Sequence, residues 1–311
     1  MFKTIPKIMN FYWEGDNFSY LHLLSVKSFI QHNPDWTCRM YTSFDPNLQE
    51  NPWPTPEQEE VYTGNNYFSE VSSLGVEIID INSKIDISEH INPVHKSDIL
   101  RWKLLSEGGG WSDCDILFTK PLTHLYKNEN GPVINNICNI EEEELGGVIS
   151  YFSSPGYGGS WCCHVIGFYL SCKDNPIFIK LYKTALEALE KFDWSASSGY
   201  QDFGRILWEK AFSPKSLECL YPGSHLILDK LYPDVKMANL GGLPLYIYVW
   251  TDIDSIYEMC DDKYKHNDVV GIHWYNGHKL ARKFTNSFSR ETALDDLPDT
   301  TIKNVIMSNE S

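Results

Sequence analysis

Short apolar runs alternate along the chain with longer stretches of helical spacing. The apolar runs predict strands at 5–13, 36–41, 76–79, 116–118, 148–152, 165–171, 226–228, 246–250 and 269–276. Helical spacing predicts helices over 19–31, 92–107 and 175–191, with a further helix beginning within 199–204. Strands that alternate with helices are typical of a mainly parallel α/β sheet, which binds its ligands at the carboxyl ends of its strands.

The segment 92–118 carries the strongest chemical signal. Its helix begins with Asn92 as a cap and ends at the glycines 108–110. Asp113 and Asp115 follow at once, just before an apolar run. Two carboxylates spaced i and i+2 can converge on one divalent cation, which prefers oxygen ligands and often serves phosphate-bearing substrates. An isolated Asp-x-Asp is more often a solvated turn, but the flanking glycines and strand favour a metal site here.

Asp98 and Arg101, three residues apart, share one face of this helix. The stretch from Ser97 to Asp115 resembles the "SD-x-x-R … GG-x-y-x-D-x-D" signature of DXD-type glycosyltransferases. That group includes initiating mannosyltransferases, α-1,4-galactosyl and α-1,4-N-acetylglucosaminyl transferases, and clostridial glucosylating toxins. The resemblance implies a GT-A fold, with a Rossmann-like, mainly parallel central sheet flanked by helices and a small extra sheet near the metal site.

The run at 269–276 resembles the "A-x-H-x-W-N-x-S-W" ending of the α-1,4 transferases. The resemblance implies that His273 reaches the metal or the diphosphate. Asn276 follows it on the donor side, and Lys279 or His278 could offset the charge of the diphosphate. Read alone, a histidine in an apolar strand is more often a core residue with satisfied hydrogen bonds.

The first strand resembles the family's opening "IPKIIH-x-x-W", with Asn10 in place of the usual histidine. In the family the tryptophan at its end lies against the nucleotide base, which makes Trp13 a predicted stacking residue; a core tryptophan is the equal alternative. Gln201 and Asp202, at a predicted helix start, are expected on the acceptor side. Capping of that helix by Asp202 is the competing interpretation.

Composition limits the possible functions. A net charge of −16 over 311 residues argues against binding nucleic acid, which requires a basic surface. Eight cysteines without a CxxC pair favour a reducing compartment. No apolar stretch approaches the roughly 20 residues of a transmembrane helix, and residues 1–7 lack a signal-peptide core, so we predict a cytoplasmic protein. One domain is expected over 1–285, followed by a frayed tail over 286–311.

Together these features predict a metal-dependent glycosyltransferase. It would move a sugar from a nucleoside diphosphate, UDP in preference to GDP, to a hydroxyl of a glycan or protein, with retention by resemblance. Asp115 would coordinate Mn²⁺ or Mg²⁺, with Asp113 on the metal's water shell or the ribose, and His273 favouring Mn²⁺. Asp98 and Arg101 would orient the sugar and diphosphate. The alternatives are a non-catalytic nucleotide-sugar binder and a hydrolase of nucleotide sugars, although a hydrolase should carry a second metal cluster.

Overall fold

The chain was analysed as a computed structural model. The structure describes residues 4–44, 62–87, 91–125, 145–149, 151–154, 161–164, 166–192, 203–212, 228, 231–239, 270–274, 276–277, 279–297 and 301–310. The strands are β1 Ile8–Tyr12, β2 Thr37–Thr42, β3 Glu77–Asp80, β4 Gly109–Ser112, β5 Ile116–Phe118, β6 Leu145–Ile149, β7 Tyr151–Ser154, β8 Trp161–His164, β9 Phe168–Ser171, β10 Lys236–Asn239 and β11 Gly271–His273. The α-helices are α1 Tyr20–His32, α2 Pro93–Glu107, α3 Pro176–Leu189, α4 Arg205–Phe212, α7 Lys279–Ser287 and α8 Thr301–Glu310.

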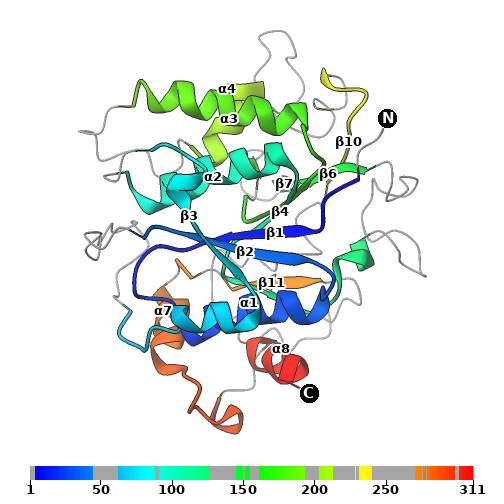
Figure 1. The fold of residues 1–311 in the computed structure, drawn as a ribbon. Helices are drawn as coiled ribbons and strands as arrows, with labels where there is room; N and C mark the ends of the chain where they lie inside the picture. The colour runs from blue at the N-terminus through cyan, green and yellow to red at the C-terminus, as the bar shows by residue number, and fades with distance from the viewer. Residues whose placement is uncertain are drawn as a thin grey trace.

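Within these residues, seven strands form one sheet in the order β10-β6-β9-β4-β1-β2-β3. All neighbouring pairs are parallel except the two that involve β9. Helices α2, α3 and α4 cover one face of the sheet, and α1, α7 and α8 cover the other (Figure 1). A separate two-stranded sheet pairs β5 with β11. The predicted α/β architecture, including a small sheet near the acidic pair, is therefore confirmed.

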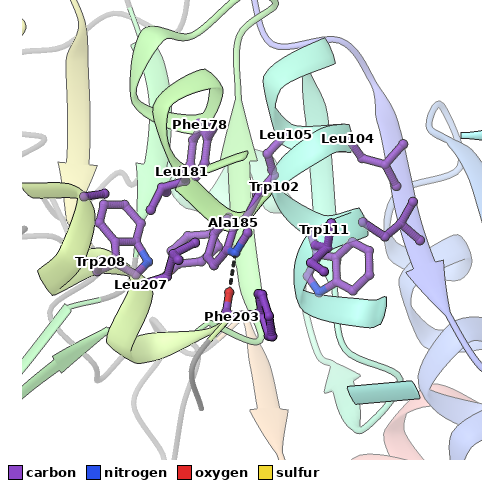
Figure 2. Close-up of a cluster of buried hydrophobic side chains, with 14 of the residues drawn as sticks. Trp102, Leu104, Leu105, Trp111, Phe178, Leu181, Ala185, Phe203, Leu207 and Trp208 are labelled. Carbon is purple, nitrogen blue, oxygen red and sulfur yellow. Dashed lines mark hydrogen bonds between the residues drawn. The ribbon is translucent and has the colours of Figure 1, made fainter. Parts of the chain in front are cut away.

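Helix α2 is fixed in place by a core of large aromatic side chains (Figure 2). Trp102 packs edge-on against Trp208 and stacks on Phe178, and all three are fully buried. Its indole N–H donates to the carbonyl of Phe203 at 2.7 Å, which ties α2 to the start of α4. Burying side chains of this size contributes roughly 1.5–3 kcal/mol each. The face of α2 that carries Asp98 is consequently held rigidly.

Strand β4 was not expected, because glycines are depleted in strands. The three glycines at 108–110 were predicted only to end α2, and Gly108 does cap it. The next two begin β4, the strand between β1 and β9. A Cβ on Gly109 would lie 2.8 Å from the backbone oxygen of Ile8, so only glycine allows the strands to approach here. The prediction of a single strand over 148–152 was also wrong, because the segment is divided between β6 and β7.

The expectation of a frayed tail over 286–311 is wrong for its described part. Helix α8 lies there, with Ile302, Val305 and Ile306 buried against α1 and β5. Their spacing of i, i+3 and i+4 forms an apolar face. Asn309 donates a hydrogen bond to the carbonyl of Phe118 in β5 at 3.0 Å, which fixes the end of the helix.

No helix within the described part of the chain has the length and apolar character needed to cross a membrane. Three cysteines in this part, Cys38, Cys114 and Cys172, are buried thiols. The strands predicted at 226–228 and 246–250 lie outside the described residues, apart from residue 228.

Candidate metal and nucleotide site

The acidic pair lies at the carboxyl edge of the central sheet. Asp113 follows β4 directly, and its backbone N–H donates to the carbonyl of Gly167 at 2.7 Å. Asp115 immediately precedes β5, the strand that leaves the main sheet for the small one. The intervening Cys114 is buried beside the end of β1, where its thiol contacts the carbonyl of Tyr12 at 3.5 Å. The chain direction therefore changes between the two carboxylates, which lets both face the same space.

The small sheet brings His273 to this pair from the far end of the sequence. His273 pairs with Ile116 in the β5–β11 register, and the backbone N–H of Trp274 donates to the carbonyl of Asp115 at 3.0 Å. The imidazole Nε2 lies 3.0 Å from Asp115 Oδ1. The backbone N–H of Asn276 binds the other oxygen, Oδ2, at 2.9 Å.

One ligand atom each from Asp113, Asp115 and His273 lie within 4.8 Å of one another. Two carboxylates and an imidazole form a mixed oxygen and nitrogen donor set that fits a divalent cation such as Mn²⁺. Asn276 supports a cation site here. Its buried side-chain Oδ1 has no hydrogen-bond partner within the described residues, and an amide oxygen of this kind can face a cation. The residues present thus fit the divalent cation that the sequence predicted.

Arg101 connects the helix to the acidic pair. Its Nη1 donates to Asp98 Oδ1 at 2.9 Å, and its Nη2 donates to Asp113 Oδ1 at 3.1 Å. The guanidinium also lies over the ring of Trp111, 4.9 Å from the centroid. The indole N–H of Trp111 donates to the same Asp113 oxygen at 2.9 Å. Two donors therefore bind Asp113 at Oδ1 and fix the orientation of its carboxylate.

Asp98 and Arg101 are far less exposed than Asp113. Asp98 and Arg101 each retain 4% of their side-chain exposure, whereas Asp113 retains 31%. The Asp98–Arg101 pair is thus buried behind the site, and Asp113 lies at its opening. The sequence prediction that Arg101 orients the diphosphate is untested. Its two observed contacts show that it orients Asp113.

Burial and neighbouring charges set the pKa of each acid differently. Burial raises the pKa of Asp98 to about 7, although Arg101 acts in the opposite direction. Burial also raises the pKa of Asp113, with Arg101 opposing it and the charge of Asp115 adding to it. Burial acts to raise the pKa of Asp115 too, but the charge and hydrogen bond of His273 outweigh it and lower that pKa.

The pKa of His273 is raised from 6.5. Burial acts to lower it, and the carboxylates of Asp115 and Asp113 more than compensate. The raised pKa of His273 and the lowered pKa of Asp115 both favour the protonated imidazole beside an ionised carboxylate. A cation at this position would replace that proton.

The start of α4 closes the site behind Asp98. A Cβ on Gly204 would lie 2.7 Å from Asp98 Oδ2 and 2.8 Å from the side chain of Ile166. Gln201 and Asp202, predicted on the acceptor side, lie outside the described residues. The residues that follow them, Phe203 and Gly204, lie against α2 at the site.

Trp13 stands just beyond β1, at the same edge of the sheet as the acidic pair. The ring is half-buried and packs edge-on against Phe18, with centroids 5.1 Å apart, and against His22 at 4.4 Å. The prediction that it stacks on a nucleotide base is untested. Lys279 begins α7, three residues after Asn276, and its predicted contact with the diphosphate is likewise untested.

Two residues of the site were missed in the sequence. No function was predicted for Trp111, yet its indole N–H binds Asp113. Its position two residues before Asp113 was the available signal, because side chains at i and i+2 of a strand share a face. No feature of the sequence indicated Gly204, because its proximity to Asp98 depends on how α4 packs against α2.

Comparisons with known proteins give a likeness in structure only. No family model and no curated protein sequence matches the chain. Among solved structures, the chain is similar to the PaToxG glycosyltransferase, with 16% identity, coverage of 75% of this chain and 76% of that chain, and a TM-score of 0.42. The galactosyltransferase LgtC, solved with donor and acceptor sugar analogs, shows 13% identity, coverage of 92% and 97%, and a TM-score of 0.39.

A third similar structure is the glycosyltransferase GlyE of Streptococcus pneumoniae, with 12% identity and a TM-score of 0.44. The match covers 98% of this chain, which spans 60% of the GlyE chain. These structural neighbours are glycosyltransferases, the class that the sequence motifs resemble. Likenesses of this degree say nothing about the donor, the acceptor or the reaction of this chain.

Proposed function

We propose that this chain is a metal-dependent glycosyltransferase that moves a sugar from a nucleoside diphosphate, UDP in preference to GDP, to a hydroxyl of a glycan or protein. The observation that carries the proposal is the convergence of Asp113, Asp115 and His273 at the carboxyl edge of an α/β sheet. Ligands of such sheets bind at this edge. A bound divalent cation would supply charge neutralisation and Lewis acidity for a departing diphosphate.

The roles of the side chains follow from their contacts. Asp115, Asp113 and His273 would hold the cation, and the N–H of Asn276 holds the Asp115 carboxylate in orientation. Arg101 is a positioning residue, since its fork fixes Asp113 against Asp98. Trp13 would contact the base. Retention of configuration, implied by the motif resemblance, requires no dedicated protein base, because a leaving diphosphate oxygen on the same face can accept the acceptor's proton.

The two alternatives differ from this proposal in turnover. A hydrolase would activate water, and a second cluster of metal-ligating side chains would support it. The described part of the chain contains one group of side chains that could hold a metal ion, formed by Asp113, Asp115 and His273. A non-catalytic binder would retain nucleotide affinity without turnover.

Thermal-shift measurements with UDP and GDP, with and without Mn²⁺, test the proposal on the wild type and on Asp115→Asn. A ligand that binds only the folded state raises the melting temperature, so we expect a Mn²⁺-dependent rise in the wild type that the variant loses. Asp86→Asn, at an exposed carboxylate, is the matched control and should behave as wild type. A rise that does not depend on Mn²⁺, or that persists in Asp115→Asn, refutes the metal assignment.

Donor turnover then separates the candidate functions. Transfer to glycan acceptors above the rate of water hydrolysis is expected for the proposed activity. Binding without turnover across a panel of UDP- and GDP-sugars would instead favour the binder.

A further inference from the structure

Helix α1 carries a polar stripe on its buried face. His22, Ser25, Ser28 and His32 follow one another at helical spacing, and they face the small sheet and α8. Three of the four have partners there: Ser25 Oγ accepts from the indole of Trp274 at 3.1 Å, Ser28 Oγ accepts from the backbone N–H of Phe118 at 2.9 Å, and His32 bonds Asn309 at 2.9 Å. His22 is the residue of the stripe nearest the site. Among the described residues, its Nε2 has no hydrogen-bond partner in the small sheet or in α8.

The hydrogen bonds of His22 define its tautomer. The backbone N–H of Ser19 donates to its Nδ1 at 3.1 Å, and the Ser19 hydroxyl lies 2.7 Å from the same atom. Nδ1 therefore accepts, which places the proton of the neutral ring on Nε2. This Nε2 is buried and has no hydrogen-bond partner within the described part of the chain. His22 as a whole is 1% exposed.

The surroundings of His22 place this unpaired donor beside the candidate site. The ring lies between two indoles, with its centroid 4.4 Å from that of Trp13 and 4.9 Å from that of Trp274. Trp274 directly follows His273, and the backbone of Trp274 binds Asp115. The indole N–H of Trp13 is likewise buried and has no partner among the described residues. Two neighbouring rings thus each hold a buried N–H donor without a described partner, near the edge of the sheet that carries the acidic pair.

His22 remains neutral in this environment. Burial lowers its pKa to about 3; the charge of Asp115 acts to raise it, and the charge of Arg282 acts to lower it further. A neutral N–H between two indoles suits an uncharged oxygen acceptor better than a phosphate, whose charge would favour the imidazolium. A buried donor without a partner destabilises the folded protein, so an acceptor that binds there is favoured because it satisfies that donor.

We propose that the Nε2–H of His22 donates to an oxygen on the nucleoside half of the donor substrate, either a base carbonyl or a ribose hydroxyl. The inference rests on the proposed function and extends it from the diphosphate to the nucleoside. His22 is then a specificity residue that acts beside Trp13. The group of Asp113, Asp115 and His273 would hold the cation at the diphosphate end, independently of His22.

Calorimetric titration with UDP and with inorganic pyrophosphate, each with saturating Mn²⁺, tests the assignment on His22→Met and His22→Gln. The methionine removes the donor, whereas the glutamine amide retains an N–H. Losing one hydrogen bond should weaken UDP binding about 5- to 10-fold in His22→Met, with recovery in His22→Gln and pyrophosphate affinity within about twofold of wild type. Ser28→Ala is the matched control, because it removes a hydroxyl of the same stripe and leaves His22 and the Ser19 hydroxyl unchanged.

Two results would overturn the inference: unchanged UDP affinity in His22→Met, or an equal loss of affinity for pyrophosphate. Failure of the proposed function is distinguishable, since the wild type would then show no Mn²⁺-dependent binding of either ligand.

The wild type provides a measurement that does not depend on how the variants fold. In ¹⁵N-histidine NMR spectra at about pH 5, His22 should stand out as a neutral ring, because ordinary histidines are protonated there. UDP should shift its Nε2 signal and pyrophosphate should not. A shift with UDP but not with 2′-deoxy-UDP identifies the ribose 2′-hydroxyl as the acceptor, and a shift with both assigns the acceptor to the 3′-hydroxyl or a base carbonyl. An Nε2 signal that UDP leaves unchanged overturns the inference.

Discussion

Replacing Arg101 by methionine tests whether this guanidinium organises the acidic site. The substitution removes the two donors that bind Asp98 and Asp113, together with the positive charge over the ring of Trp111. Methionine fills most of the volume of the aliphatic stem, so lost packing is a minor effect. Asp98, with 4% of its side-chain exposure, is left as a buried carboxylate without this partner.

The magnitude follows from the titration of Asp98. Its pKa is raised from 3.8 to about 7 even with Arg101 present, which corresponds to about 4 kcal/mol between its two protonation states. Between these values the folded state binds more protons than the unfolded state, so this contribution to stability is full below 3.8 and is lost as pH rises through about 7. Removing Arg101 takes away the charge that opposes the rise, so the pKa of Asp98 moves higher still.

Arg101→Met should therefore lower the free energy of unfolding by about 3–5 kcal/mol at about pH 8.5, and by clearly less at about pH 6, where Asp98 is protonated. Denaturant unfolding of the wild type, Arg101→Met and the double variant Asp98→Asn/Arg101→Met measures this. The double variant should recover most of the loss at high pH and remain inactive.

The matched control is Arg39→Met, which breaks an exposed ion pair with Glu77 of the same 2.9 Å length. Exposed pairs contribute about 0–1 kcal/mol, so little change is expected. A loss in Arg101→Met that is as small as in Arg39→Met, or that does not grow with pH, would refute the claim that Arg101 compensates a buried carboxylate.

Three further predictions concern the site itself. Gly204→Ala should displace the Asp98 carboxylate and reduce kcat at least about tenfold, with a stability loss of only about 1–3 kcal/mol. Steady-state kinetics and denaturant unfolding measure the two effects, and full activity would show that the contact is tolerated. Trp13→Ala should raise the KM for the donor more than it lowers kcat, and an unchanged KM would contradict base contact. The affinity for Mn²⁺ in calorimetry should rise with pH above 6.5, because the raised pKa of His273 means that a proton competes with the metal; affinity independent of pH would exclude His273 as a ligand.

The parts of the fold that local chemistry determines were predictable from the sequence. Ser19, Asn92 and Asn175 cap α1, α2 and α3 near the predicted starts, and each cap depends on residues adjacent in the chain. Gly108 ends α2 as expected. These signals act over one helical turn, so a single sequence contains them completely.

The missed elements depend on contacts between distant segments. Strand β4 exists because β1 and β9 approach the glycines from both sides, and the glycines themselves disfavour a strand. Helix α8 was missed because its apolar residues are few, and their burial depends on α1 and β5. In both cases tertiary packing outweighed local propensity, as it does for β structure generally.

The same distinction divides the site. The spacing of Asp113 and Asp115 indicated a metal site, and the motif resemblance added Asp98 and Arg101 from the same short segment. The position of His273 beside them depends on the antiparallel pairing of β5 with β11, which local spacing does not reveal. The motif resemblance supplied that residue. His22 had a weak local signal, as the first member of a polar stripe on an otherwise apolar helix.

The charge balance of the described site explains why it resembles a cation site more than a closed structural network. Arg101 is shared between Asp98 and Asp113, so one fixed positive charge faces two carboxylates. Asp115 is balanced by His273 only while that ring is protonated. Above the pKa of His273 the group therefore carries excess negative charge around Asp113 and Asp115. A divalent cation removes that excess and is favoured by the same deprotonation, so metal occupancy and the loss of the His273 proton are coupled.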